Sequence, residues 1–486
     1  MTSIIRILFA GVMLISLISF TPTVSANLLP DLDASAGGAT TFLSIPAAAF
    51  LPSGSNTTSP PNYENHGRYV KYFGPNFEGQ FKAQVQLPQG AQIISVKACF
   101  YDDSASLSAK LNFVSATNYG LTYITQIEST GASGYQEIVE LDYPETIDYG
   151  GHVYYRLDLK LPKSTGAGSN VWGCGATIEY LPPEIDSSIL ALGSAAFNPF
   201  ENGYTYDDWF ALRLFYLQNN AAGTGKFMAP VNLPDGASVN KLSMRIFDEG
   251  TGYTVNAKIQ RADHNGNYST LGDLNCQGIE DKICSLVIPA FTIDNSQYTY
   301  WVHVLLPTSL ISNYIYLSGV NLEYHVVPDQ HENVIGISNT AFTPFFDSQE
   351  YENHARWLIH KHGEGGSNSR GVYVASVNLP DKVTIDGFEA CFYDGSTTLA
   401  GNAFLIRTRL GVNNTMASAS SMGSSGYSGV PDYTVNWNVV DNNQYAYFVY
   451  WDLPIATTPV DGGDVVGCGM AVHYHYPVYL PMIVNQ

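Results

Sequence analysis

Short motifs recur three times along this chain at an almost constant interval, and this repetition constrains the fold more than any other feature. Three markers define each copy: a phrase of the type AFxP, a Leu-Pro pair after an alternating run, and a second Leu-Pro pair after an aromatic run. Their positions are Phe50, Phe197 and Phe342; Leu87, Leu233 and Leu379; and Leu161, Leu306 and Leu453. Successive copies are therefore 145 to 147 residues apart. A copy of this size can bury its own core, so we expect three tandem domains and not a solenoid.

The N-terminus predicts an export signal. Arg6 precedes an apolar run through Phe20, and small residues follow up to Ala26. A membrane anchor is the alternative, but the apolar run is short and no charged residue follows it. We therefore expect a secreted protein, located outside the cell or at its surface. The expected divisions are residues 1–26 for the signal peptide, 27–183, 184–328 and 329–476 for three domains, and 477–486 for an apolar tail.

Composition narrows the classes of partner. The formal net charge is -21 at pH 7, with 22 Lys and Arg against 43 Asp and Glu. Nucleic acid is excluded as a partner, because phosphate binding needs clustered basic residues. Only 13% of residues are charged, whereas 33 are Tyr, which suits sheets with uncharged outer faces. Calcium or a cationic polymer could neutralise the carboxylates, but the simpler interpretation is that the charge keeps an exported protein dispersed.

Alternating apolar and polar residues predict β-strands throughout each copy. The run from Phe81 to Leu87 places its apolar residues on one face, and Pro88 ends it. The next run is expected to turn Ile94 and Phe100 inward. Further strands are predicted over residues 107–116, 121–128, 136–143, 154–161 and 172–181. About eight or nine short strands per copy predict an all-β chain of three tandem antiparallel β-sandwiches of jelly-roll type.

Six cysteines predict three disulfides. The first and third copies each carry one cysteine before FYD and one in a GCG strand, and the middle copy lacks both. A joint loss is expected of a bonded pair, because a lone thiol is a liability in an oxidising compartment. Cys174 has the inward parity of its strand, so its pairing requires a bulge at Gly173 and Gly175. Zinc is the alternative, but no Cys-x-x-Cys spacing supports it. The predicted pairs are Cys99–Cys174, Cys276–Cys284 and Cys391–Cys468.

A charged segment shared by two copies is the candidate ligand loop. It reads YENHGR in the first copy and YENHAR in the third, so a carboxylate, an imidazole and a guanidinium fall within five residues. Such a set can bind a sugar or transfer protons. A loop held by side-chain hydrogen bonds is the alternative that we favour, since the middle copy lacks the motif. The candidates are Tyr63, Glu64, His66, Arg68, Tyr351, Glu352, His354 and Arg356.

Acidic residues end the same strand in all three copies. Paired carboxylates in a loop can hold calcium, although a turn closed by an aspartate side chain explains the repetition more simply. His473 and His475 alternate along the last strand and could bind a metal, but no third ligand accompanies them. No other cofactor and no catalytic residue is predicted, because common catalytic motifs are absent. The calcium candidates are Asp102, Asp103, Asp248, Glu249 and Asp394.

The AFxP opening, the LPDG turn, the strand ending in FYD and the GCG strand resemble a module of secreted bacterial proteins, and the terminal YLPMIVN resembles their tails. The resemblance implies a jelly-roll-like β-sandwich and export, without catalytic residues.

We therefore expect a non-enzymatic structural or adhesive protein of a surface layer, sheath or filament, associating with itself or with other surface proteins. A carbohydrate-binding protein that stacks glycans on Trp172 or Trp357 is the alternative, and a polysaccharide-acting enzyme is the third. The tail either folds back as an edge strand or is donated to a neighbouring molecule.

Overall fold

The computed structural model describes most of the chain between residues 40 and 477. The predicted signal peptide, the loop residues His354 and Arg356, and the tail after Pro477 lie outside the described residues. The described ranges are 40–52, 63–74, 78–117, 120–131, 134–141, 145–149, 154–165, 170–183, 187–200, 206–208, 217–219, 224–249, 253–263, 267–308, 315–325, 333–345, 351–353, 357–360, 370–421, 426–455 and 465–477.

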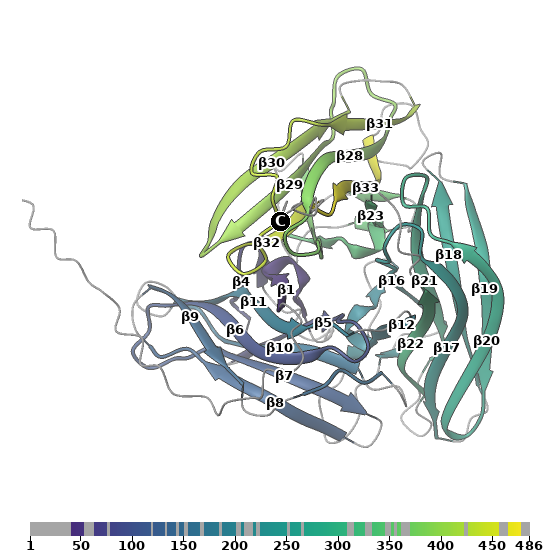
Figure 1. Cartoon of the computed structure of the whole chain (residues 1–486), viewed down its shortest axis with the longest axis horizontal. Coiled ribbons are helices and arrows are strands. Elements are labelled where there is room, and N and C mark those ends of the chain that lie inside the picture. The colour runs from purple at the N-terminus through teal and green to yellow at the C-terminus, as the bar shows by residue number, and fades with distance from the viewer. Residues whose placement is uncertain are drawn as a thin grey trace, which may run out of the picture. The chain divides into compact units, whose positions relative to one another are not determined.

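The described residues form antiparallel β-strands in six sheets, with three short 3-10 helices and no α-helix among them. The predicted all-β, antiparallel class is therefore confirmed. Each sequence copy contributes one six-stranded and one five-stranded sheet. We call the copies the first module (β1–β11), the second module (β12–β22) and the third module (β23–β33). Figure 1 shows their strands in purple to blue, in teal, and in green to yellow.

The first module begins at β1 and ends with β11, and one 3-10 helix, η1, follows its first strand. Its elements are β1 (Thr41–Pro46), η1 (Ala47–Ala49), β2 (Leu51–Pro52), β3 (Tyr63–Asn65), β4 (Val70–Tyr72), β5 (Glu78–Val85), β6 (Gln92–Asp102), β7 (Lys110–Thr117), β8 (Gly120–Glu128), β9 (Gly134–Glu140), β10 (Tyr154–Pro162) and β11 (Val171–Leu181).

The second module repeats this order. Its elements are β12 (Ser187–Gly193), η2 (Ser194–Ala196), β13 (Asn198–Pro199), β14 (Tyr206–Asp208), β15 (Leu217–Asn219), β16 (Gly225–Pro230), β17 (Ser238–Asp248), β18 (Thr254–Asp263), β19 (Tyr268–Gln277), β20 (Glu280–Thr292), β21 (Tyr298–Leu306) and β22 (Ile315–His325).

The third module repeats it again. Its elements are β23 (Asn333–Ile337), η3 (Asn339–Ala341), β24 (Thr343–Pro344), β25 (Tyr351–Asn353), β26 (Leu358–His360), β27 (Arg370–Ser376), β28 (Thr384–Asp394), β29 (Asn402–Arg409), β30 (Val412–Ser420), β31 (Gly426–Asp432), β32 (Ala446–Pro454) and β33 (Val465–His475).

The three modules share one sheet topology. In the first module the larger sheet has the order β3-β4-β11-β6-β9, with β1 also paired to β11, and the smaller sheet has the order β2-β5-β10-β7-β8. The chain therefore alternates between the two sheets of a module. Buried residues of both sheets form one cluster, as Phe100 of β6 does with Phe81 of β5 and Leu157 of β10.

The prediction of one core residue in β6 is wrong by a single position. Ile94 was expected to face inward, but the register between β6 and β11 shifts between Glu179 and Tyr180, so that Ile93 is paired with Tyr180. Ile93 is therefore buried in the core and Ile94 is only partly buried. Simple alternation fails here because the bulge changes which face each residue occupies.

Hydrogen bonds and apolar contacts link the modules in a cycle. Ala48 of η1 packs in one cluster with Val374 and Phe448 of the third module. The Gln84 side chain of the first module donates to the carbonyl of Ala191 in the second, at 3.2 Å. Asn198 of the second module donates to the carbonyl of Thr340 in the third, at 2.9 Å. Thr40–Gln486 accordingly forms one compact unit.

Within the described ranges, no helix is long and apolar enough to cross a membrane.

Candidate functional site

The predicted ligand loop of the first module lies where that module meets the third. Nε2 of His66 lies 2.9 Å from a carboxylate oxygen of Glu64. The His66 ring also stacks on Tyr69 and meets the edge of Phe345 from the third module. Burial lowers the pKa of His66, although the Glu64 carboxylate acts in the opposite direction. The imidazole is thus enclosed by packing.

Two other residues of this loop join the modules directly. The backbone N–H of Asn65 donates to the carbonyl of Phe345 at 2.9 Å. Arg68 donates from Nη1 to the carbonyl of Gly411 at 3.0 Å, also in the third module. The Asn65 side chain donates to the carbonyls of Ala47 and Phe50, which fixes η1 beside the loop. The segment therefore connects the first module to the third through Asn65 and Arg68, beside the partly exposed pair of Glu64 and His66.

The equivalent segment of the third module contacts the second in the same way. The backbone N–H of Asn353 donates to the carbonyl of Phe200 at 3.3 Å, and its side chain donates to Asn339 at 2.6 Å. Tyr351 is buried, and this burial raises its pKa to about 12. The side chain of Glu352, like all of His354 and Arg356, lies outside what the structure describes.

The aspartates that end the repeated strand close turns. Asp102 is fully buried, and its two carboxylate oxygens accept from the backbone N–H of Ser104 at 2.9 Å and from the hydroxyl of Ser129 at 2.5 Å. Asp394 makes the same two bonds, to Ser396 at 2.8 Å and to Ser421 at 2.5 Å.

The remaining calcium candidates do not gather into a site either. Asp103 accepts from the backbone and side-chain nitrogens of Asn170. Asp248 is buried at its strand end, and Glu249 is exposed beside it. Each of the two histidines of β33 lies beside its own carboxylate, His473 at 3.8 Å from Glu389 and His475 at 2.7 Å from Asp386. The described residues contain no group of three or more His, Cys, Asp or Glu that could hold a metal ion.

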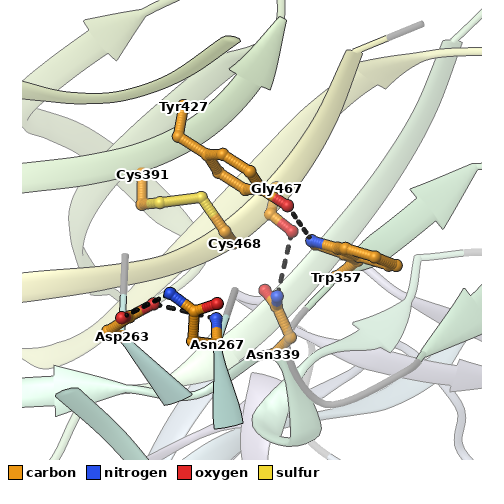
Figure 2. Close-up of a disulfide and its surroundings, with 8 residues drawn as sticks. All are labelled: Asp263, Asn267, Asn339, Trp357, Cys391, Tyr427, Gly467 and Cys468. Atoms are coloured by element: carbon orange, nitrogen blue, oxygen red, sulfur yellow. Dashed lines mark hydrogen bonds between the residues drawn. A yellow bond between two sulfur atoms is a disulfide. The ribbon is translucent and has the colours of Figure 1, made fainter. Parts of the chain in front are cut away.

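The structure contains the three disulfides that the sequence predicts. Cys174 reaches Cys99 because the register of β11 against β6 shifts between Gly173 and Gly175, as expected. Gly175 has a φ of +123°, and a Cβ there would lie 2.5 Å from the carbonyl of Ile45, so only glycine fits this bulge. Figure 2 shows the equivalent Cys391–Cys468 disulfide of the third module.

The middle module has an ion pair at the position of the first of these cysteines, and it joins a different pair of strands. Arg245 stands where the other modules have cysteine, and its Nε and Nη2 donate to the two carboxylate oxygens of Asp281 at 2.9 and 2.6 Å. Asp281 lies on β20, which pairs with β17. A bidentate pair of this kind fixes two strands laterally without a covalent bond.

Trp172 and Trp357, the tryptophans expected to stack on sugars, belong to rows of aromatic rings across neighbouring strands. Trp172 stacks on Tyr101 with ring centroids 3.9 Å apart and planes 7° from parallel. Tyr69 packs beside Trp172 at 5.2 Å, and Tyr135 meets Tyr101 edge-on at 5.1 Å. In the third module Nε1 of Trp357 donates to the hydroxyl of Tyr427 at 3.0 Å (Figure 2). The facing sides of Trp172 and Tyr101 cannot also stack on a sugar.

A different tryptophan, which sequence analysis did not single out, is more accessible. Trp437 is 51% exposed in the turn between β31 and β32. Its φ of +50° is unusual for a bulky residue and costs free energy. The guanidinium of Arg407 lies between Trp437 and Tyr445, at 4.3 and 4.4 Å from the ring centroids. No sequence signal marks this arrangement, because it depends on a turn conformation that only the third module has among the described residues.

Comparisons with known proteins were made for the whole chain. No family model matches it, and no curated protein matches it. Similar solved structures include the tandem CBM22 domains of Paenibacillus barcinonensis Xyn10C, with 12% identity over 58% of this chain and 96% of that chain and a TM-score of 0.21. An archaeal virus protein with a triple jelly roll fold shows 10% identity over 90% and 91% of the two chains and a TM-score of 0.18. Likenesses at these scores carry no argument about what this chain does.

Proposed function

We propose that this chain is a non-enzymatic structural protein of the cell exterior, a component of a surface layer, sheath or filament. One observation carries the proposal: the segments that hold the candidate acid–base residues also join modules to one another. Asn65 and Arg68 bind backbone carbonyls of the third module, and Asn353 binds one of the second. A protein selected for a rigid assembly of modules needs such residues, whereas an enzyme needs them free to meet a substrate.

We also propose that each pair of sheets is a jelly-roll sandwich. A six-bladed propeller is the other architecture with six sheets, and each of its blades is a radially repeated unit. Here the strands of two sheets interleave along each module, and their buried residues share one cluster in each of the three modules. Interleaving and a shared core support three sandwiches.

Export is part of the proposal. Three disulfides are expected of a protein in an oxidising compartment. Among the described residues no cysteine is free. Both features favour a location outside the cytoplasm, in agreement with the predicted signal peptide.

The proposal is tested by two measurements on the full chain. Purified protein is incubated with a panel of polysaccharides, and electron microscopy of an exporting host is used to locate it. We expect no turnover and an ordered array at the cell surface. Turnover that is abolished by Glu64→Gln, but kept in the matched control Glu78→Gln on β5, would contradict the non-enzymatic role.

Carbohydrate binding is the second candidate, favoured by the exposed ring of Trp437. One side of this ring faces Arg407, and stacking of a sugar on the exposed remainder is the usual mode of aromatic recognition. On a glycan array, Trp437→Ala should then abolish binding, while Trp172→Ala and the exposed control Tyr123→Ala should not. Binding that survives Trp437→Ala would remove this candidate.

A further inference from the structure

The larger sheets of the three modules end, on the same side of their shared topology, at β9, β20 and β31. In the first and third modules this edge strand has 7 residues, whereas β20 of the second module has 13. β20 pairs with β17, and no other described strand of the larger sheet pairs with it. An edge of this kind leaves backbone N–H and C=O groups available to another strand.

Two of these edge strands contain residues that oppose pairing, and the middle of β20 contains none. β9 contains Glu137 and Glu140, and β31 contains Pro431 and Asp432. Charges and proline are the usual means by which a sheet edge avoids association. The middle of β20, residues 283–288, reads ICSLVI and has neither a charge nor a proline. This composition is typical of a segment that pairs with another strand.

The outer face of this part of β20 exposes apolar side chains. Ile283 is 48% exposed and Val287 is 79% exposed, and the exposed Ser285 lies between them. Cys284 and Leu286, which alternate with these residues, pack against the core of the second module. The apolar side chains of the outer face therefore leave water only when another molecule covers them.

β20 is fixed to both of its neighbours. Arg245 of β17 donates to both carboxylate oxygens of Asp281, at 2.9 and 2.6 Å. The Cys276–Cys284 disulfide joins β20 to β19, which is the edge strand of the smaller sheet. Figure 1 shows β19 and β20 side by side in the second module. An edge that is already rigid loses little conformational entropy when it pairs with a partner.

We propose that β20 pairs with β20 of a second copy of this chain, in antiparallel register about Ser285. Two identical strands that pair in this way are related by a twofold axis, the commonest symmetry of protein dimers. Ile283 then lies opposite Val287 of the second copy, and Val287 lies opposite Ile283. The charged residues 280–282 lie opposite residues 288–290, which carry no charge, so like charges do not oppose one another. The edge is thus complementary to itself.

This contact would join two six-stranded sheets into one continuous sheet. A contact through one strand of each copy is smaller than a standard protein interface, so we expect a weak dimer with a Kd in the micromolar range or above. The proposal does not depend on the structural role proposed above, because the argument uses only the edge of one sheet.

Sedimentation of the purified chain over a series of concentrations tests for this dimer. Val287→Lys should raise the dissociation constant by about tenfold or more, because it places a charge on the pairing edge. Val139→Lys on β9 is the matched control, since Val139 is 57% exposed on the corresponding edge of the first module. We expect this control to leave the dissociation constant unchanged.

Cysteine substitution tests the register. Ser285→Cys places the two new thiols opposite each other, and the Cα separation of opposed residues, about 4.5 to 5.5 Å, suits a disulfide. On air oxidation we expect a covalent dimer whose linked peptides, identified by mass spectrometry, both contain position 285. Ile283→Cys should give no such product, because the two 283 positions lie about 14 Å apart in this register.

Three results would overturn the proposal. The first is a chain that remains monomeric up to about 1 mM. The second is a dimer that Val139→Lys weakens as much as Val287→Lys does. The third is a covalent dimer from Ile283→Cys but not from Ser285→Cys, which would show another register. A monomer in solution would not decide the structural role, which electron microscopy of the exporting host tests separately.

Discussion

At the scale of single residues, buried polar side chains of this chain hydrogen-bond to one another and to the backbone, and these bonds stabilise the fold. Asp394 binds Ser421, and the Ser421 hydroxyl oxygen accepts from the backbone N–H of Gly401. Asp102, Ser129 and Ala109 repeat this arrangement in the first module. In the first and third modules, three strand ends are therefore held by one buried carboxylate and one hydroxyl. Burial of these two carboxyl groups is tolerated because both oxygens of each accept hydrogen bonds.

Replacing Asp394 with alanine should lower the free energy of unfolding by about 2 to 4 kcal/mol, because two buried donors lose their acceptor. Urea denaturation measures the change. Calcium and chelator should both leave the unfolding midpoint of the parent chain unchanged, since the carboxylate is used internally. A midpoint raised by calcium in the parent, but not in Asp394→Ala, would restore the calcium hypothesis.

His303 on β21 makes the stability of the protein depend on pH. Burial, with help from Lys226 and Lys258, lowers the pKa of His303 to about 4. The unfolded chain, whose histidine keeps a pKa of about 6.5, takes up the proton first as the pH falls. Stability is therefore complete above about pH 6.5 and is lost progressively down to about pH 4.

His303→Gln should remove this part of the pH dependence. When the pH falls from 7 to 4, the free energy of unfolding of the parent should decrease by about 2 to 3 kcal/mol more than that of the variant. Urea unfolding at the two pH values measures this difference. The exposed His325 on β22 provides the control, and His325→Gln should follow the parent. Equal losses in the parent and in His303→Gln would contradict the assignment.

At the scale of strands and sheets, the sequence predicts much of the structure. The run expected over residues 154–161 is β10, and the run expected over 172–181 is β11. Alternation suffices for these strands because the apolar residues of one face of each strand pack in the core of the module. It fails at Ile94, where a bulge shifts the register. A bulge depends on pairing with a strand that is distant in the sequence. The only bulge that the sequence predicted is the one at the two glycines beside Cys174.

The disulfides should contribute differently to the stability of the fold, according to the length of the loop that each closes. Cys391 and Cys468 are 77 residues apart, whereas Cys276 and Cys284 are 8 apart. Restriction of the unfolded chain is worth about 4 to 5 kcal/mol for the longer loop and about 2 to 3 kcal/mol for the shorter. Paired alanine substitutions, compared by urea unfolding under oxidising conditions, measure this difference. A larger loss from the shorter loop would contradict the entropic argument.

At the scale of the whole molecule, the modules depend on one another. Asn295 donates from Nδ2 to Leu233 of its own module at 2.9 Å and to Val334 of the third module at 2.6 Å. Asn442 makes the equivalent bonds to Leu379 and, in the first module, to Phe42. Each asparagine thus fixes a Leu-Pro turn to the first strand of another module.

Asn442→Ala should destabilise the protein by about 1 to 3 kcal/mol, because two carbonyls lose their donor. Asn295→Ala should do the same. Thermal and urea unfolding measure both effects. The exposed Asn438 offers a matched control, and Asn438→Ala should change stability by no more than about 0.5 kcal/mol. An effect of Asn442→Ala no larger than that of the control would show that this contact does not hold the modules together.

The packing of modules could not be predicted from the sequence. Ala48, Val374 and Phe448 form an interface, yet each resembles an ordinary apolar residue of its own strand. The YENH segments were recognisable as special, but their role depends on Phe345 and Gly411, which are hundreds of residues away. Local patterns specify strands and turns, whereas contacts between modules are set by surfaces that only the folded chain brings together.

The central claim is that three modules form one interlocked, cooperative unit. Hydrogen exchange along a urea series, read from peptides of β6, β17 and β28, tests it most directly, since each of these strands is paired on both sides in the larger sheet of its module. The account predicts one common midpoint, and a common shift to lower urea in Asn442→Ala. Three separate midpoints, with only the third module shifted by Asn442→Ala, would contradict it.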